Sequence, residues 1–325
     1  MGFASFNKTF FLALFGTIFM TIAGDISTAI AKCSSNNLFK KVRSYETIID
    51  NSNGNDLADI YFPIHQNNIN IKSFPIALLL QGALVDKSDY SKFAKIVASY
   101  GFVVVVPNNF NEIFIPPGFP QGFYSEQEQV KEVLDYMKSE NSNFSSPIFD
   151  IIDTSKLVLL GHSYGGIVGL NAIEGSCIFP YCTTNYIRPT ELVGGAFYGA
   201  DYNQLGLFEE TPPIDNSGIP ITLLAGTLDG LVEIKAIQET YHQIQDSPKS
   251  FISIAGGNHY SITNTNQPFT IPDPNPPKLK QNLGIKIIAH WSALFLRANI
   301  LKDDNAFKRC FKKRIGGNYL TIEQQ

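Results

Sequence analysis

Hydrophobic runs alternate along the chain with segments in which hydrophobic residues recur every third or fourth position. Residues 75–80 and 102–106 are hydrophobic almost throughout, which is typical of strands buried on both faces of a parallel sheet. Between them, residues 90–100 have helical spacing, and Gly101 ends the predicted helix. The same rhythm continues further on, where strands are predicted at 156–160, 192–198, 219–225 and 250–254 and helices at 126–139, 165–173, 232–244 and 280–299.

Before this region, alternating hydrophobic and polar positions at 45–49 and 57–62 predict two half-buried strands separated by a turn. Strands that alternate with helices in this way form a mainly parallel sheet with helices on both faces, an α/β fold. No repeat or linker divides the chain after residue 40, so residues 32–325 are predicted to form a single domain. In such sheets, ligands bind at the loops that follow the carboxyl ends of the strands.

The charge balance and the motif content exclude several classes of partner. The chain has 25 Lys and Arg against 29 Asp and Glu, a net charge of -4. Because nucleic acid binding needs clustered cations, and only residues 308–314 offer a short cluster, we predict no nucleic acid partner. The sequence has neither a metal-ligand cluster nor a nucleotide-binding glycine motif, so it predicts no metal and no cofactor.

The first residues have the features of an export sequence. Residues 9–24 are apolar apart from three threonines, and the small-residue pattern Ala29-Ile30-Ala31 follows. This pattern is typical of a signal peptide, residues 1–31, cleaved before Lys32. An uncleaved anchor is the alternative, although sixteen residues fall short of the roughly 20 that span a bilayer. We therefore predict a secreted or periplasmic protein with no stable membrane span after cleavage; its oligomeric state is left open.

If the chain is exported, its four cysteines can form disulfides, because an oxidising compartment permits them. Cys177 and Cys182 have a spacing that can close a small loop. Cys33 and Cys310 then remain, one near each end of the mature chain, and can pair with each other. The alternative is four free thiols.

The clearest chemical motif is Gly161-His162-Ser163-Tyr164-Gly165, which directly follows the predicted strand 156–160 and precedes a predicted helix. A G-x-S-x-G sequence in this context forms a sharp turn that presents the serine hydroxyl at the edge of the sheet. The alternative is a turn that only packs the helix on the strand. The flanking elements favour a nucleophilic serine at position 163.

A serine nucleophile needs a base within hydrogen-bond reach and an acid that orients the base. Among the five histidines, only His259 lies in a loop that follows a predicted strand end. Asp229 follows the strand 219–225 and is the predicted acid, and Asp201 is the alternative acid. The order Ser, Asp, His resembles that of the α/β-hydrolases.

Attack on a carbonyl also requires two N–H groups that receive the developing oxyanion. One is predicted at Tyr164, directly after the nucleophile. The other is predicted at Ala83, in the loop Gln81-Gly82-Ala83 that follows the strand 75–80.

Residues 78–107, together with the motif GHSYGG, resemble the chlorophyllase and polyester-hydrolase branch of the α/β-hydrolases, which is related to dienelactone hydrolases. The resemblance covers residues 40–300. It implies an α/β-hydrolase fold with a sheet of about eight strands, little or no cap domain, and an ester as substrate. It also supports Ser163, Asp229 and His259 as a triad, with Ala83 and Tyr164 as oxyanion donors.

Two residues depart from this resemblance. Gln81 stands where the branch often has histidine, and Tyr164 stands where chlorophyllases have arginine. For the second reason, chlorophyll is not carried over as the substrate.

The loop 108–124 combines aromatic residues with prolines and is expected above the catalytic end of the sheet. Such side chains can form an apolar wall for a substrate, or they can simply pack the loop on the protein. The candidate substrate-binding residues are Phe110, Phe114, Phe119 and Phe123.

Taken together, these features predict an enzyme that cleaves carboxylic esters through an acyl-enzyme, acting on an apolar or lipid-like ester. An acyltransferase with the same triad is the second interpretation. A non-catalytic binding protein that has kept the fold is the third. Peptidase activity is a further use of this scaffold, although the chain has no large accessory domain that would select peptides.

Overall fold

The structure is a computed structural model that describes residues 38–51, 54–64, 71–111, 120–304, 306 and 320–324. The strands of its main sheet are β1 (Val42–Asn51), β2 (Gly54–Pro63), β3 (Phe74–Leu80), β4 (Val103–Pro107), β7 (Ile152–His162), β8 (Leu192–Tyr198), β9 (Ile221–Gly226), β10 (Lys249–Ile254) and β11 (Leu320–Gln324).

These nine strands lie in the order β1-β2-β4-β3-β7-β8-β9-β10-β11. All neighbours from β4 to β10 run parallel. The pairs β1–β2, β2–β4 and β10–β11 are antiparallel. A separate short ladder pairs β5 (Phe110–Asn111) with β6 (Gly122–Phe123).

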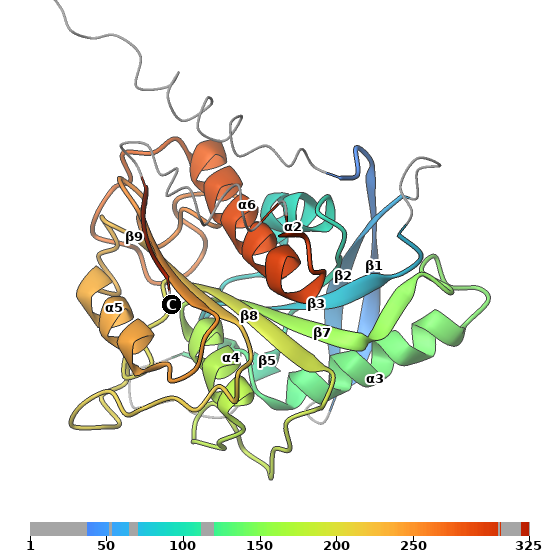
Figure 1. Ribbon diagram of the computed structural model, residues 1–325, viewed down its shortest axis with the longest axis horizontal. Helices are drawn as coiled ribbons and strands as arrows, with labels where there is room; N and C mark the ends of the chain where they lie inside the picture. Colours follow the sequence, from blue (N-terminus) through green and yellow to red (C-terminus); the bar gives the residue numbers. More distant parts are fainter. Residues whose placement is uncertain are drawn as a thin grey trace, which may run out of the picture.

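The helices form two layers, one on each face of the sheet (Figure 1). One layer contains α2 (Ser91–Ala98), which follows the short 3₁₀ helix η1 (Lys87–Tyr90), and α6 (Gln281–Ile300). The other layer contains α3 (Glu128–Ser142), α4 (Tyr164–Glu174) and α5 (Ile234–Gln243).

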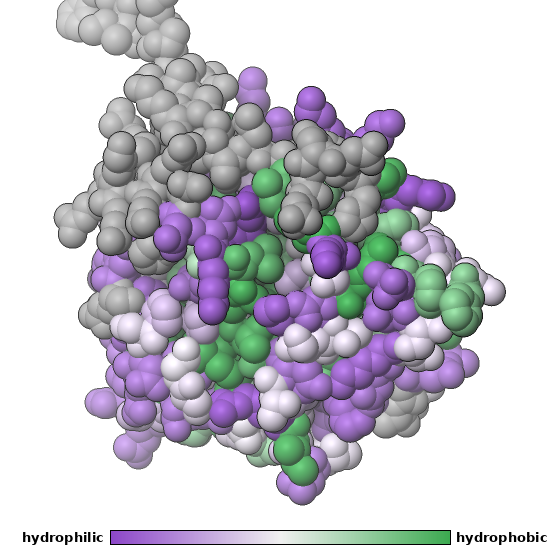
Figure 2. All heavy atoms as spheres, turned by 45° about the vertical axis from the view of Figure 1, so that its right-hand side comes forward, coloured by the Kyte–Doolittle hydropathy of each residue, from purple (hydrophilic) through white to green (hydrophobic). Residues whose placement is uncertain are grey.

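The central strands are buried on both faces, which explains their continuous hydrophobic sequences. Along β3, Leu78 and Leu80 face the core under α3, α4 and α5. Ala77 and Leu79 face the second core, under α2 and α6. Successive side chains of a strand point to opposite faces, so both cores require apolar residues here. On the face shown in Figure 2, hydrophobic residues gather near the centre and hydrophilic residues border them.

The predicted α/β fold, with helices on both faces of a large sheet, is confirmed, with differences in detail. The main sheet has nine described strands rather than about eight, and three of its pairs are antiparallel. The strand of this sheet that was not predicted is β11, which adds to the β10 edge. Between β8 and β9, residues 199–220 contain no helix, so no helical cap is inserted there.

Two predictions about the ends of the chain are not tested by this structure. The predicted signal peptide, residues 1–31, lies outside the described residues, and the single domain at 32–325 stays a prediction. Among the helices that are described, none is both long and apolar enough to cross a bilayer.

The cysteine prediction is confirmed for one pair. Cys177 and Cys182 form a disulfide in the loop that follows α4. This loop also contains Tyr181, whose ring lies 5.1 Å from the ring of Tyr164, between centroids. The disulfide therefore closes a loop that packs against the first residue of α4. Cys33 and Cys310 lie outside the described residues.

Candidate active site

Four loops meet at the carboxyl ends of the parallel strands. They follow β3, β7, β9 and β10, and they carry Gly82, Ser163, Asp229 and His259 respectively. A pocket of about 130 Å³ opens between them. Its lining includes Ala83, Ser163, Tyr164 and His259, so the structure brings these predicted residues together at one pocket.

Ser163 lies in the sharp turn between β7 and α4. Its φ of 52° and ψ of −123° are strained for a residue with a side chain. The turn can be this tight because Gly165 lies against the end of β3, where a Cβ would collide with the carbonyl oxygens of Leu80 and Gln81. Ser163 itself is 8% exposed and lines the pocket.

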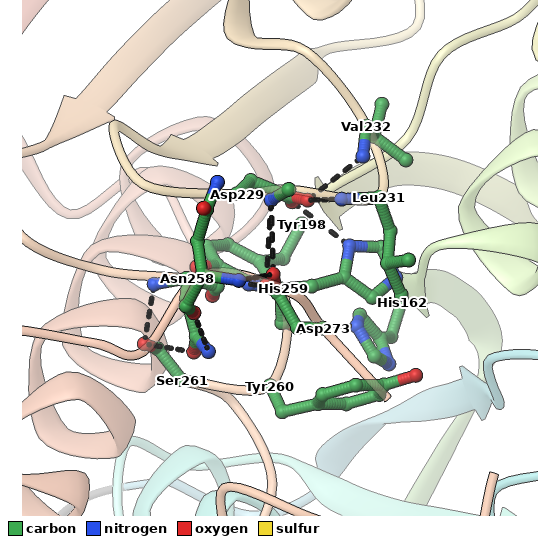
Figure 3. Close-up of polar contacts among 12 residues, drawn as sticks. His162, Tyr198, Asp229, Leu231, Val232, Asn258, His259, Tyr260, Ser261 and Asp273 are labelled. Atoms are coloured by element: carbon green, nitrogen blue, oxygen red, sulfur yellow. Dashed lines mark hydrogen bonds and ion pairs between the residues drawn. The ribbon is translucent and has the colours of Figure 1, made fainter. Parts of the chain in front are cut away.

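His259 and Asp229 form a buried pair (Figure 3). His259 Nδ1 lies 2.8 Å from Asp229 Oδ2, and the two side chains are only 3% and 0% exposed. Since a carboxylate only accepts, Nδ1 carries the proton and Nε2 of the neutral ring is free to accept one. The other oxygen, Asp229 Oδ1, accepts from the amides of Leu231 (3.0 Å) and Val232 (2.8 Å). Hydrogen bonds to both carboxylate oxygens therefore hold the Asp229 side chain in place.

Asp201, the alternative acid, has a different environment. Its Oδ1 accepts from the Asn203 amide at 3.1 Å and from the Thr240 hydroxyl at 3.3 Å. Burial raises the pKa of this carboxyl group. His259 is paired with Asp229, whereas Asp201 connects the loop after β8 to α5.

The two predicted oxyanion donors, Ala83 and Tyr164, both line the pocket together with Ser163. Neither the Ala83 amide nor the Tyr164 amide donates to an acceptor among the described residues. Gln81 shapes the Ala83 loop from within, because its Nε2 donates to Val85 O at 3.0 Å and its Oε1 accepts from Asn109 N at 3.2 Å. The glutamine in place of histidine thus has a structural role in this loop.

Polar groups that the sequence did not single out hold the main chain around His259. Asp273 Oδ2 accepts from His259 N at 2.8 Å, and its Oδ1 accepts from Gly230 N at 3.2 Å. The Tyr198 hydroxyl donates to Asn258 O at 2.5 Å. The segment Asp273-Pro274-Asn275-Pro276-Pro277 indicates only a loop in the sequence; nothing local shows that its carboxylate reaches back to the loop of His259.

His162 is fully buried beside the ring of His259, 4.8 Å away between centroids. Its Nδ1 lies 2.9 Å from the hydroxyl of Tyr90, and its Nε2 lies 2.9 Å from the carbonyl oxygen of His259. Burial, and then the proximity of His259, lower the pKa of His162 well below its usual 6.5. His162 is therefore neutral at pH 7.

A larger apolar groove of about 630 Å³ adjoins the pocket. Thr270 and Ile271 line both. Of the four predicted aromatic residues, Phe123 lines this groove and packs edge-on against Phe110, with 6.0 Å between ring centroids. The other two, Phe114 and Phe119, lie outside the described residues. The lining also includes Phe269, which is fully exposed and was not predicted.

In the part of the chain that the structure describes, no three His, Cys, Asp or Glu side chains lie close enough together to hold a metal ion.

Comparison with known proteins shows a partial similarity to one family. Residues 65–174 match the family model described as chlorophyllase. A protein of Chenopodium album named chlorophyllase type 0 is 24% identical over 159 residues, which cover 39% of this chain and 43% of that protein. The predicted resemblance to the chlorophyllase branch of the α/β-hydrolases is confirmed.

The chlorophyllase match covers one part of the site and not the other. It includes the loop of Ala83 and the turn of Ser163, and it ends at residue 174. Asp229 and His259 lie after it. Their assignment therefore depends on the geometry of the pocket and on their place in the chain. The match to the chlorophyllase of Chenopodium album spans less than half of that protein, so its whole activity does not transfer with the match.

Proposed function

We propose that this chain is a serine hydrolase that cleaves carboxylic esters through an acyl-enzyme. The observation that carries the proposal is the buried pair of His259 Nδ1 and Asp229 Oδ2, at 2.8 Å, in the pocket lined by Ser163. The chlorophyllase-family match supports the general hydrolase class. A non-catalytic protein would have no need to keep a strained serine and an oriented imidazole at one pocket.

In the proposed reaction, His259 Nε2 takes the hydroxyl proton of Ser163 as Oγ forms a bond to the ester carbonyl carbon. The amides of Ala83 and Tyr164 donate to the resulting oxyanion. When the C–O bond to the alcohol breaks, His259 returns the proton to the leaving alkoxide. Water then attacks the acyl-enzyme with the same proton transfers, and the acid and free Ser163 are released.

The shape of the site supports an apolar ester as the substrate. The pocket beside Ser163 has room for only a small group, and the adjoining groove is lined by apolar residues of two loops. An acyl chain or an apolar alcohol can lie there and remove water from Phe123 and Phe269. Chlorophyll is not proposed, because position 164, where chlorophyllases have arginine, holds a tyrosine packed between Tyr124 and Tyr181.

We further propose a secreted or periplasmic location. It rests on the signal-like sequence of residues 1–31 and on the Cys177–Cys182 disulfide, which an oxidising compartment favours. In this proposal, residues 32–325 act as one domain without cofactor, metal or nucleic acid.

The first test is the hydrolysis of p-nitrophenyl esters from acetyl to palmitoyl, together with covalent labelling by a fluorophosphonate. We expect turnover and labelling by the wild-type chain and loss of both in Ser163→Ala. Ser250→Ala is a matched control, because Ser250 is also buried but bonds Thr222 within the sheet, away from the pocket. Labelling without turnover indicates a narrower substrate range, whereas absence of both overturns the proposal.

Two further results distinguish the related activities. If an added alcohol captures most of the acyl group in competition with water, the enzyme is an acyltransferase. A preference for long chains supports the role of the apolar groove, and a preference for acetyl contradicts it.

A further inference from the structure

Three hydrogen bonds join the oxyanion loop, the serine turn and the histidine loop. Gly82 N donates to the Tyr90 hydroxyl oxygen at 2.9 Å, Tyr90 contacts His162 Nδ1 at 2.9 Å, and His162 Nε2 contacts His259 O at 2.9 Å. Tyr90 and His162 are both completely buried. The ester hydrolysis proposed above uses neither side chain in a chemical step.

The acceptors fix the direction of each bond in this series. A backbone carbonyl only accepts, so His162 Nε2 carries the proton. The ring is neutral, so Nδ1 is unprotonated and accepts from the Tyr90 hydroxyl. The Tyr90 oxygen in turn accepts from Gly82 N–H. The Tyr90 hydroxyl and both ring nitrogens of His162 therefore each have a hydrogen-bond partner. One tautomer of His162 accounts for its bonds to Tyr90 and to the His259 carbonyl.

Close packing restricts the positions of Gly82, Tyr90 and His162. A Cβ at Gly82 would lie 2.8 Å from His162 Nδ1 and 3.3 Å from the Tyr90 oxygen, so only glycine allows this approach. The rings of Tyr90 and His162 meet edge-on, with 5.9 Å between centroids. Breaking one bond leaves a buried polar atom without a partner, which is costly in a site that excludes water.

We propose that Tyr90 and His162 are positioning residues of the hydrolase, which hold the oxyanion loop and the backbone of His259 in register with Ser163. His162 acts on the base through the carbonyl of His259, and Tyr90 acts on the oxyanion loop through the amide of Gly82, one residue before Ala83. The inference rests on the proposed ester hydrolysis. It adds two residues that act on catalysis through the loops that they hold in place.

Tyr90→Phe is the central variant, because it removes only the hydroxyl and keeps the buried ring. The chain offers a matched control in Tyr100→Phe. Tyr100 is also buried, and its hydroxyl lies 2.6 Å from Nδ1 of another buried histidine, His290 in α6. The Tyr100–His290 pair lies outside the pocket lining. Both variants therefore break a buried tyrosine–histidine bond, and only one of them touches the catalytic loops.

For Tyr90→Phe we expect kcat to fall about 10- to 100-fold, the scale of a misplacement of about 1 Å in an active site. The rate of fluorophosphonate labelling should fall in parallel, while KM changes less than about threefold because the substrate contacts are retained. Tyr100→Phe should lose similar thermal stability and keep wild-type kcat. His162→Gln, which retains one acceptor and one donor, should preserve more activity than His162→Met.

Wild-type kcat and labelling rate in a folded Tyr90→Phe chain would overturn the positioning role, as would an equal loss of kcat in Tyr100→Phe. Equal activity of folded His162→Gln and His162→Met also contradicts it. These outcomes are separate from failure of the proposed function, in which the wild-type chain itself shows neither turnover nor labelling at Ser163.

Discussion

At the scale of single residues, the imidazole of His259 has a fixed orientation. Its Nδ1 proton is engaged by Asp229, so Nε2 is the nitrogen that can take a proton from a nucleophile. Asp229 in turn cannot rotate, because Leu231 and Val232 bind its second oxygen. The orientation of the His259 ring thus depends on backbone amides two and three residues beyond Asp229.

This arrangement predicts a sharp difference between two aspartates. Asp229→Asn should lower kcat by about 10⁴-fold, because an amide can donate to Nδ1 and favour the wrong tautomer of His259. Asp201→Asn should change kcat by less than about threefold. The measurement is the kcat of each variant for the same p-nitrophenyl ester, compared with that of the wild-type chain. A larger loss in Asp201→Asn would reassign the acid.

The neutral buried state of His162 makes stability depend on pH. Its folded-state pKa is lowered below 6.5, so the unfolded chain binds this proton more readily than the folded chain does. The contribution of neutral His162 to the free energy of unfolding is fully present above pH 6.5. It is lost as the pH falls towards the lowered folded-state pKa. In that window each pH unit removes about 1.4 kcal/mol from the free energy of unfolding.

Urea unfolding between pH 5 and pH 7.5 measures this effect. His162→Gln should give a shallower decline with falling pH than the wild-type chain. The control is His242→Gln, at an exposed position of α5, which should keep the wild-type slope. The same slope in His162→Gln and in the wild-type chain would show that His162 does not control it.

At the scale of elements, the turn around Ser163 depends on the contact between α4 and β3. Gly165→Ala places a methyl group against the carbonyl oxygens of Leu80 and Gln81, which belong to the sheet and its oxyanion loop. We expect a loss of about 3 kcal/mol or more, since neither backbone can move aside. Gly175→Ala, at the other end of α4, brings the new Cβ only into ordinary contact with Arg188 Cβ, at 3.8 Å, at a φ of 82°. It should lose only about 1 kcal/mol.

Urea denaturation of the two glycine variants distinguishes them. If Gly165→Ala unfolds at the same urea concentration as Gly175→Ala, the close approach of α4 to β3 does not determine the stability of the turn.

Most helices and strands, and the turn around Ser163, could be predicted from the local sequence. The hydrophobic run predicts β3, and the glycines around Ser163 predict the turn before α4, from a few neighbouring residues alone. Asp273 and Tyr90 do not, because each acts through a contact with a residue far along the chain, 14 residues for Asp273–His259 and 72 for Tyr90–His162. A single sequence contains no information on which of several aspartates or tyrosines makes such a contact.

At the scale of the whole molecule, the sequence predicts the parallel centre of the sheet better than its edges. The central strands are buried on both faces and therefore read as continuous hydrophobic runs. β11 is short and partly exposed, with the sequence Leu320-Thr321-Ile322-Glu323-Gln324, and no local pattern separates it from a loop. Its pairing with β10 depends on the exposed backbone of that edge, which is a property of the assembled sheet.

The pairing of β11 with β10 also bears on how this protein behaves in concentrated solution. Five residue pairs, from Ser250↔Gln324 to Ile254↔Leu320, satisfy the edge of β10. Removal of residues 320–325 would leave β10 as an open template for a strand of another molecule. We expect the shortened chain to form oligomers or aggregates as its concentration rises, while retaining ester hydrolysis as a dilute monomer. Light scattering against protein concentration measures this, and unchanged scattering after the deletion would contradict it. In this prediction, β11 prevents the edge of β10 from pairing with other copies of the chain.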